Sequence, residues 1–382
     1  MEKGSLITMK KAGYDMLYLV SCALNNQKPD LGKIKECDLQ KLLTMAKRHS
    51  LVAIVAVALE SLGEYCTKEW LEERDKAIRK NILLSAEYNQ LANYLDEQGI
   101  WYMPLKGYIL KEYYPKNGMR QMADIDILFD SKYREKVNEF FKSWGYEEKS
   151  FGDSHHDVYL KQPIYNYEMH VSLYTESWNE VFYKYYSNIK EKLIKQEKCK
   201  NGYRFTNEDF YIYIISHAYK HYTGSGTGIR TIADCYVYLK CEERNMDWVY
   251  ISQEFEKLGI SEFEEELRHL SKKVFGDWGI ETLGEVERKR LEYFLFSGTY
   301  GTMKNMVNNK INKLKKGKSV IQAKCIYFLK RIFPGKGVLQ VYCPYVAKYK
   351  ILLPYAWTKR MVKGIVFKHK SIVNEMRCIN KV

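Results

Sequence analysis

The stretch Asp124-Ile125-Asp126-Ile127-Leu128-Phe129 predicts the central strand of the fold. Apolar residues at 125, 127 and 129 alternate with positions that include two acids, a pattern typical of a β-strand with one buried face. Residues two apart on a strand point to the same side, so Asp124 and Asp126 would present their carboxylates together. Two such charges are costly side by side unless a cation lies between them, and their oxygen atoms suit Mg²⁺ or Mn²⁺. The motif therefore predicts a divalent-metal site.

Residues 99–176, which surround this motif, predict an α+β unit with a small mixed sheet. An apolar run stops at Lys106-Gly107 and is followed by a short helical segment that ends before Pro115. Downstream, the pattern predicts a helix and then two strands, over 132–144, 158–160 and 165–173. The sheet of this unit would carry the two acids on one of its faces.

Helical patterns dominate the chain on both sides of this unit. Residues 1–98 have apolar positions at three-to-four spacing, and Gly99 is suited to end the last of their helices. Residues 177–303 predict a second helical region, in which a Gly-Ser-Gly-Thr-Gly turn at 224–228 separates two helices. We expect this second region to support the substrate and nucleotide.

The composition of the 382 residues is that of a folded soluble protein. Hydrophobic residues make up 46% and aromatic residues 14% of the chain, with only 7 prolines, which excludes a disordered chain. No charge-free apolar run approaches the roughly 18 to 20 residues that a membrane span needs. The 9 cysteines include no CxxC pair, which argues against a disulfide framework and indicates a reducing compartment. We therefore expect a cytoplasmic protein.

Basic residues are concentrated at the C-terminal end of the chain. The net charge is +14, and residues 304–382 hold 19 Lys and Arg residues against a single acid, Glu375, so the rest of the chain is slightly acidic. We expect this basic tail to form short helices broken by Pro334, Pro344 and Pro354. Such a tail can hold nucleic acid, can hold an anionic lipid surface at the inner face of the membrane, or can simply raise solubility.

Three further positions in the α+β unit bear on phosphate chemistry. Gly107, between a predicted strand and a short helix, lets backbone N–H groups approach phosphate oxygens. Glu168 lies in an aromatic and apolar strand, where an acid is expensive to bury without a partner. His155-His156-Asp157 precedes this region and is expected to be a loop that can face the substrate. Phosphoryl transfer needs such carboxylates to hold metal ions against a nucleotide.

Polar residues of the second helical region allow several interpretations. His217 and His221 are four apart on a helix and share a face. They could bind zinc together with Asp234, contact substrate or phosphate, or form structural hydrogen bonds. Arg230 and Asp234 are also four apart, a spacing that predicts an ion pair.

This layout resembles the DNA polymerase β-like nucleotidyltransferase superfamily, in which a strand, a glycine turn and a helix precede a strand with Asp-x-Asp and a later strand with one acid. Within it, Leu105-Lys106-Gly107, the run 120–128 and Glu168-Met169-His170 resemble the uncharacterised bacterial nucleotidyltransferase family. The runs 217–221 and 230–234 are similar to the region that follows that family's catalytic core.

The resemblance implies roles for ten residues. Asp124 and Asp126 would ligate two metal ions, and Glu168 would complete one metal site and help the acceptor hydroxyl to lose its proton. Lys106 and Gly107 would hold the triphosphate. Further contacts to the nucleotide are expected from Arg120, His170, His217, His221 and Arg230.

The resemblance also implies an activity, the transfer of a nucleoside monophosphate from an NTP to an acceptor hydroxyl or phosphate with release of pyrophosphate. The acceptor is left open among small molecules, RNA and proteins. An alternative is a catalytically silent module that binds nucleotide or RNA and is anchored by its basic tail. The enzymatic interpretation requires that the acids at 124, 126 and 168 converge, with none turned into bulk solvent and none plugged by a lysine.

Overall fold

A five-stranded mixed sheet forms the centre of the α+β unit. The structure, a computed structural model, describes residues 3–335, 339 and 349–381. The strands are β1 (Tyr102–Pro104), β2 (Ile125–Phe129), β3 (Glu147–Ser150), β4 (His156–Lys161) and β5 (Tyr165–His170). Their order in the sheet is β1-β2-β5-β4-β3, with β2 and β5 parallel and the other neighbouring pairs antiparallel. The prediction of an α+β fold with a small mixed sheet and helical flanks is confirmed.

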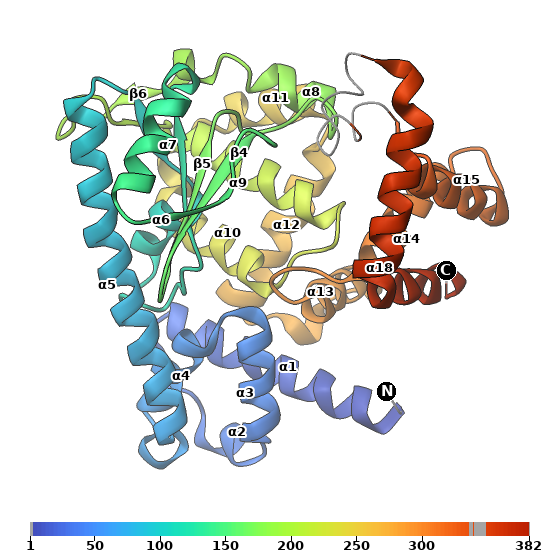
Figure 1. The fold of residues 1–382 in the computed structure, drawn as a ribbon. Coiled ribbons are helices and arrows are strands. Elements are labelled where there is room, and N and C mark those ends of the chain that lie inside the picture. Colours follow the sequence, from blue (N-terminus) through green and yellow to red (C-terminus); the bar gives the residue numbers. More distant parts are fainter. Residues whose placement is uncertain (1–2, 336–338, 340–348, 382) are drawn as a thin grey trace.

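The two faces of this sheet have different surroundings. One face packs against α5 (Lys68–Glu97) and α7 (Arg134–Ser143) through a buried apolar cluster that includes Ile125 and Ile127 (Figure 1). Side chains alternate along a strand, so Asp126, between these two isoleucines, faces the opposite side. The helices that follow the sheet in sequence lie on the side of this polar face.

Helices before and after the sheet share one hydrophobic core. The N-terminal helices are α1 (Lys3–Leu24), α2 (Leu31–Lys35), α3 (Leu39–His49) and α4 (Val52–Glu60). The helices after the sheet are α8 (Glu180–Tyr185), α9 (Asn207–Tyr222), α10 (Ile229–Glu242), α11 (Trp248–Leu258), α12 (Ser261–Ser271) and α13 (Glu285–Ser297). Two smaller features are α6 (Lys106–Leu110) and a hairpin of β6 (Ile194–Lys195) and β7 (Tyr203–Arg204). Buried residues of both helical sets form a single cluster.

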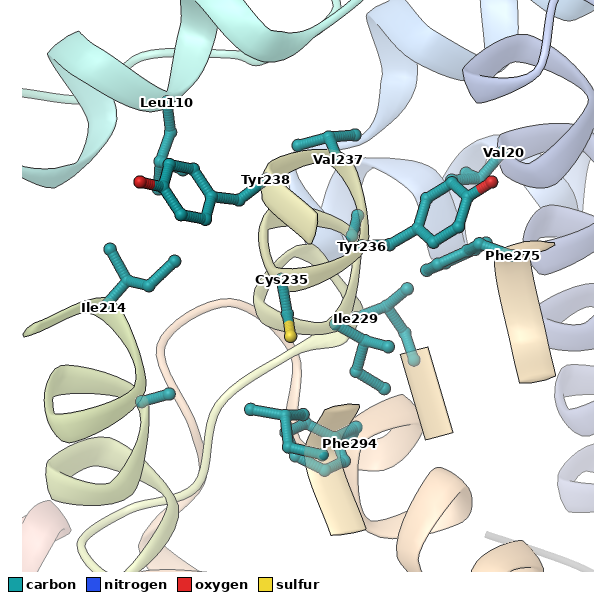
Figure 2. Close-up of a cluster of buried hydrophobic side chains, with 14 of the residues drawn as sticks. Val20, Leu110, Ile214, Ile229, Cys235, Tyr236, Val237, Tyr238, Phe275 and Phe294 are labelled. Carbon is teal, nitrogen blue, oxygen red and sulfur yellow. The ribbon is translucent and has the colours of Figure 1, made fainter. Parts of the chain in front are cut away.

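Helix α10 lies at the centre of this core (Figure 2). Buried side chains surround it from four other helices: Val20 of α1, Leu110 of α6, Ile214 of α9 and Phe294 of α13. At its start, the Ile229 N–H donates to Nδ1 of the buried His49 of α3 at 3.2 Å. Packing on so many sides fixes α10, and with it the side chains that α10 presents to the sheet.

The basic tail folds as helices, as the sequence predicts. It contains α14 (Met303–Leu314), α15 (Val320–Ile332) and α18 (Leu353–Asn380), which lie together at one side of the molecule (Figure 1). α18 bends at Lys368, whose φ of −130° and ψ of 21° are not helical, so it consists of two shorter helices as expected. The predicted break at Pro354 is wrong, because Pro354 lies in the first turn of α18, where the missing N–H has no helical partner to lose. Pro334 follows α15 as expected, and Pro344 lies outside the described residues. None of the helices in the described part of the chain has an apolar stretch that would span a bilayer.

Candidate active site

A cavity of about 300 Å³ opens between the polar face of the sheet and helices α9 and α10. This volume is at the lower end of the range for small-molecule sites. Nine of the ten residues that the sequence predicts for the site line this cavity: Lys106, Gly107, Arg120, Asp124, Asp126, Glu168, His217, His221 and Arg230. The tenth, His170, is buried and contacts Asp126.

Three carboxylates lie together at one side of the cavity. Asp126 of β2 and Glu168 of β5 are directly opposite each other in the parallel pairing, so their side chains leave the sheet on the same face. Asp124 directly precedes β2, so the strand begins one residue later than the alternation predicts. The Leu105 N–H donates to the Asp126 carbonyl at 2.9 Å, which joins the turn before Lys106 to this strand.

One oxygen of Asp126 has two partners. Its Oδ1 lies 2.9 Å from Nε2 of His170 and 3.2 Å from Nζ of Lys106. Burial alone would raise the pKa of Asp126, but the Lys106 ammonium and the His170 imidazole outweigh burial and lower it. Burial lowers the pKa of His170, so the contact is a hydrogen bond from a neutral imidazole to an ionised carboxylate.

The pKa values of Asp124 and Glu168 shift in the opposite direction. Burial and the charge of Asp126 raise the pKa of Asp124. Burial has the largest effect on Glu168, and together with the charges of Asp126 and Asp124 it raises the pKa of Glu168 to about 7. Lys80 of α5 donates to the carbonyl of Ala123 at 3.0 Å, which brings a positive charge close to Asp124. The protein itself thus offsets the repulsion among the three acids only in part.

The enzymatic interpretation requires that no lysine ammonium blocks the three acids, and Lys106 lies close enough to test this requirement. Its ammonium contacts Asp126, so the requirement is not met for that carboxylate. In the described part of the chain, no Lys or Arg nitrogen lies within 4.0 Å of a carboxylate oxygen of Asp124 or Glu168. The Glu168 side chain is 28% exposed and therefore is not turned into bulk solvent. The Lys106 ammonium thus offsets the charge of Asp126 and leaves Asp124 and Glu168 without a direct lysine or arginine partner among the described residues.

The backbone of Lys106 is also unusual. Its φ of 35° lies in the left-handed region, which costs a residue with a Cβ about 1 kcal/mol or more. Strained backbone of this kind persists where the surroundings hold it, and here the neighbouring Leu105–Asp126 hydrogen bond does so.

The donor atoms at this place suit a divalent cation. One ligand atom from each of Asp126, Glu168 and His170 lies within 4.8 Å of the other two. Carboxylate oxygens are the ligands that Mg²⁺ and Mn²⁺ favour. A divalent ion would also relieve the repulsion that raises the pKa values of Asp124 and Glu168. The residues present therefore fit such an ion, which would compete with the Lys106 ammonium for Asp126.

Two arginines at the cavity are held differently. The buried Arg120 makes a bidentate pair with Asp234, with Nε–Oδ1 at 2.8 Å and Nη2–Oδ2 at 2.9 Å, and the Tyr114 hydroxyl donates to the same carboxylate at 2.8 Å. The predicted ion pair between Arg230 and Asp234 is wrong, because Arg120 occupies this carboxylate. Arg230 instead donates to the Gln121 carbonyl at 3.2 Å. Burial lowers the pKa of Arg230, so an anionic partner would stabilise its charge.

Gly107 is required by the packing of Arg120. A Cβ at position 107 would lie 2.5 Å from Nη1 of Arg120 and 3.2 Å from Sδ of Met122. The absence of a side chain therefore makes room for the Arg120–Asp234 pair. The role of Gly107 in holding phosphate stays a prediction.

His217 and His221 face each other on α9, with their Nε2 atoms 3.1 Å apart. Burial lowers the pKa of both, that of His221 to about 4, so both imidazoles are neutral at pH 7. The zinc hypothesis required Asp234, which Arg120 holds. Within residues 3–335, 339 and 349–381, no third Cys, His, Asp or Glu completes a metal-binding group with this pair. Contact with a bound molecule or a structural hydrogen bond remain the two interpretations of these histidines.

A comparison with known protein families covers this whole arrangement. A protein-family model described as an uncharacterised nucleotidyltransferase matches residues 35–276, which include all ten residues that the sequence predicts for the site. The chain belongs to this nucleotidyltransferase family. Membership supports a general nucleotidyl-transfer function. No curated protein and no solved structure matches the chain.

Lys220 is a candidate site residue that the sequence patterns did not single out. Burial and the Lys106 charge lower its pKa to about 8, while Asp126 and Glu168 act in the opposite direction. Its ammonium lies over the rings of Tyr174 and Trp178, 5.5 and 5.9 Å from their centroids. The sequence did contain an indication of this residue. Lys220 comes three residues after His217, and residues three apart lie on a similar side of a helix, here α9.

The run His155-His156-Asp157 differs from the loop that was expected. His156 is the first residue of β4 and lies opposite His170 in the antiparallel pairing. Asp157 is buried and makes a bidentate pair with Arg134, at 2.6 and 2.7 Å. Because strand residues alternate, His156 shares the polar face of the sheet with the acids, whereas Asp157 belongs to the packed face.

Proposed function

We propose that the protein transfers a nucleoside monophosphate from an NTP to an acceptor hydroxyl or phosphate and releases pyrophosphate. The observation that supports this most is the register of Asp126 opposite Glu168, with Asp124 beside them, in a cavity that basic side chains border. Phosphoryl transfer asks a protein mainly for positioning and for neutralisation of charge. This cavity offers groups for both.

The residues divide between the metal and the phosphates. Asp124, Asp126 and Glu168 would hold Mg²⁺ or Mn²⁺, which when bound neutralises the charge on the phosphates and orients the attacking and leaving oxygens. Lys106 and Arg230 line the same cavity and would bind the triphosphate through their positive charges. Arg120 would act indirectly, since its guanidinium is already paired with Asp234.

The proposed chemical step exchanges one phosphorus–oxygen bond for another. The acceptor oxygen forms a bond to the α-phosphorus, the bond from that phosphorus to the bridging oxygen of the β-phosphate breaks, and pyrophosphate leaves with the electron pair. When the acceptor is a hydroxyl, its proton needs a base. We assign this role to Glu168, which lies opposite Asp126 in the sheet and would be ionised with a cation bound beside it.

The test follows the phosphates of labelled NTP. The full chain is incubated with Mn²⁺, an NTP labelled at the α- or γ-phosphate, and a cell extract that supplies acceptors. We expect the α-label on an extract component and the γ-label in pyrophosphate. Asp126→Asn should lower the transfer by about 100-fold or more. The matched control is Glu147→Gln, which changes an exposed acid of β3.

Three outcomes would contradict the proposal in different ways. Equal transfer by Asp126→Asn and the wild type would reject the assignment of the site. Transfer of the γ-label would identify a phosphotransferase instead. NTP binding without transfer in any extract fraction would favour the catalytically silent binding module.

We also propose that the basic tail holds the protein at an anionic membrane surface. Three apolar side chains at helical spacing on α18, Val362, Ile365 and Val366, are 56%, 66% and 59% exposed. Exposed lysines border this apolar stripe at 359 and 363, and another, at 370, follows the bend at Lys368. An apolar face flanked by lysines is typical of a helix that lies in the plane of an anionic leaflet. Nucleic acid would engage the lysines but would leave the apolar stripe in water.

Vesicle flotation of the full chain tests this partner. We expect binding to vesicles with phosphatidylserine, weaker binding at high salt, and none to neutral vesicles. Charge reversal of Lys359, Lys363 and Lys370 to Glu should abolish binding. The same change at the exposed Lys195, Lys198 and Lys200, which lie in the body of the protein, should preserve it. Loss of vesicle binding in both variants, or binding of RNA in place of vesicles, would overturn the proposal.

A further inference from the structure

Three imidazoles lie together beside the acidic site. His155 precedes β4, His156 begins β4, and His170 ends β5. The ring centroid of His156 lies 4.7 Å from that of His155 and 5.1 Å from that of His170, and the third distance, between His155 and His170, is 5.7 Å. Each ring can offer one nitrogen so that the three atoms lie within 4.8 Å of one another.

Two of these rings have a buried nitrogen without a partner. Nδ1 of His156 and Nδ1 of His170 are both buried and make no hydrogen bond. The Nε2 of His170 lies 2.9 Å from Oδ1 of Asp126, which leaves Nδ1 as the ring nitrogen without a partner. A buried acceptor without a partner is unusual and calls for a ligand.

We propose that His155, His156 and His170 bind a divalent transition-metal ion of the Zn²⁺ class, beside the carboxylates that suit Mg²⁺. Imidazole nitrogen is a ligand that Zn²⁺ and Co²⁺ favour, whereas Mg²⁺ favours oxygen. Three histidines leave a fourth position of a tetrahedral ion open to water or to an anionic group. This inference concerns a second ion and does not depend on nucleotide transfer.

The contacts around the three rings agree with this assignment. A histidine that binds a metal usually donates its other ring N–H to a carboxylate or another polar group. The contact from Nε2 of His170 to Asp126, at 2.9 Å, has this form. The Nδ1 of His155 lies 3.0 Å from the Ser154 hydroxyl. This contact uses one ring nitrogen of His155 and leaves the other, Nε2, for an ion. The Nε2 of His156 lies 3.9 Å from Glu168.

The second histidine pair of the cavity provides the contrast. His217 and His221 contact each other through their Nε2 atoms. No third ligand completes that pair within the described residues. It therefore serves as the matched control for any metal bound by imidazole in this protein.

Co²⁺ is the probe for this site, because a tetrahedral Co²⁺ ion absorbs visible light far more strongly than an octahedral one. The full chain, freed of metal and held in excess Mg²⁺, is titrated with Co²⁺. We expect one equivalent to bind with an intense visible band that Zn²⁺ removes. His155→Ala combined with His156→Ala should abolish the band and lower the Co²⁺ affinity by about 100-fold. His217→Ala combined with His221→Ala should preserve both.

Other outcomes would overturn the proposal. No high-affinity Co²⁺ binding, or a band that persists in the first double variant, would exclude these histidines. Loss of the band in the second double variant would place the ion on α9. Asp124→Asn separates this inference from the proposed function, since it should weaken Mn²⁺ binding and leave the Co²⁺ band. The single variants His155→Gln and His156→Gln repeat the test, and urea unfolding shows that each variant is folded.

Discussion

Nε2 of His170 lies 2.9 Å from Oδ1 of Asp126, and both side chains are more than nine-tenths buried. His170 comes two residues after Glu168 on β5, and Asp126 lies on the neighbouring strand β2. One strand thus supplies an acid of the site and also the donor that orients a second acid. Groups that are held by regular strands are positioned more rigidly than groups on loops.

Replacement of His170 by alanine should lower both stability and activity. The variant leaves Asp126 buried with Lys106 as its remaining partner on Oδ1. We expect the free energy of unfolding to fall by about 1–3 kcal/mol, and nucleotide transfer to fall by about 10- to 100-fold. Urea unfolding and the label-transfer assay measure these changes. His269→Ala, at an exposed position of α12, is the control, and equal effects of the two variants would contradict the prediction.

Glu168 should make the folded protein less stable as pH rises through the range 4.5 to 7. Its pKa is about 7 in the folded state, above the ordinary 4.5, so the folded state binds this proton more tightly than the unfolded state. The resulting stabilisation is complete below pH 4.5 and is lost as pH passes 7. Relative to Glu168→Gln, the wild-type free energy of unfolding should therefore fall over this range, by on the order of 2 kcal/mol.

Urea unfolding at a series of pH values tests the Glu168 prediction. Saturating Mn²⁺ should remove the difference between wild type and Glu168→Gln at high pH, because a bound cation stabilises the ionised carboxylate. The exposed Glu147→Gln variant should follow the wild type throughout. A wild-type protein that gains stability over Glu168→Gln as pH rises would show that the sign is wrong.

Lys106→Met should separate metal binding from nucleotide binding. The Lys106 ammonium lies 3.2 Å from Asp126 and competes with a cation for that oxygen. Its removal should tighten Mn²⁺ binding several-fold, and the lost positive charge should weaken NTP binding by about 10-fold. Electron paramagnetic resonance counts free Mn²⁺, and equilibrium dialysis measures NTP binding. Lys116→Met, at an exposed position, should change neither, and weaker Mn²⁺ binding in Lys106→Met would refute the competition.

The two arginines of the cavity should respond differently to the same substitution. Arg120→Gln leaves Asp234, whose side chain is only 14% exposed, without its ion-pair partner, and we expect a loss of about 3–5 kcal/mol in the free energy of unfolding. Arg230→Gln removes a cation that has no paired carboxylate within 4.0 Å among the described residues, so it should mainly weaken NTP binding, by about 10-fold or more. Urea unfolding and equilibrium dialysis on both variants test the contrast. A large loss of stability in Arg230→Gln together with weaker NTP binding in Arg120→Gln would show that the two roles are assigned the wrong way round.

Local patterns in the sequence predicted the elements that carry the site. The alternation over 125–129 predicted β2, and Gly99, with a φ of 67°, directly follows the α5 C-cap. Such signals depend on backbone geometry within a few residues, so they can be interpreted without knowledge of the rest of the chain. The same local reasoning failed at Pro354, because whether a proline ends a helix or begins one depends on where neighbouring residues pack.

The partners of charged side chains were not local. A spacing of four favoured an Arg230–Asp234 pair, but Arg120, 114 positions away, holds Asp234. The bidentate pair of Arg120 with Asp234 is stronger than an ion pair between residues four apart on a helix surface. Its geometry exists only once α10 is packed against the turn at Gly107. His156 likewise joined His170 through sheet register, which no pattern within either strand specifies.

The sequence alone thus determined the identity of the acids, the shared face of Asp124 and Asp126, and the family resemblance, since these depend on residue type and on the period of a strand. Only the tertiary structure decided that Glu168 lies opposite Asp126, that Lys106 shares an oxygen with His170, and that the three imidazoles meet. The physical reason is that charge pairing follows burial and strand register, which arise when distant segments exclude water together.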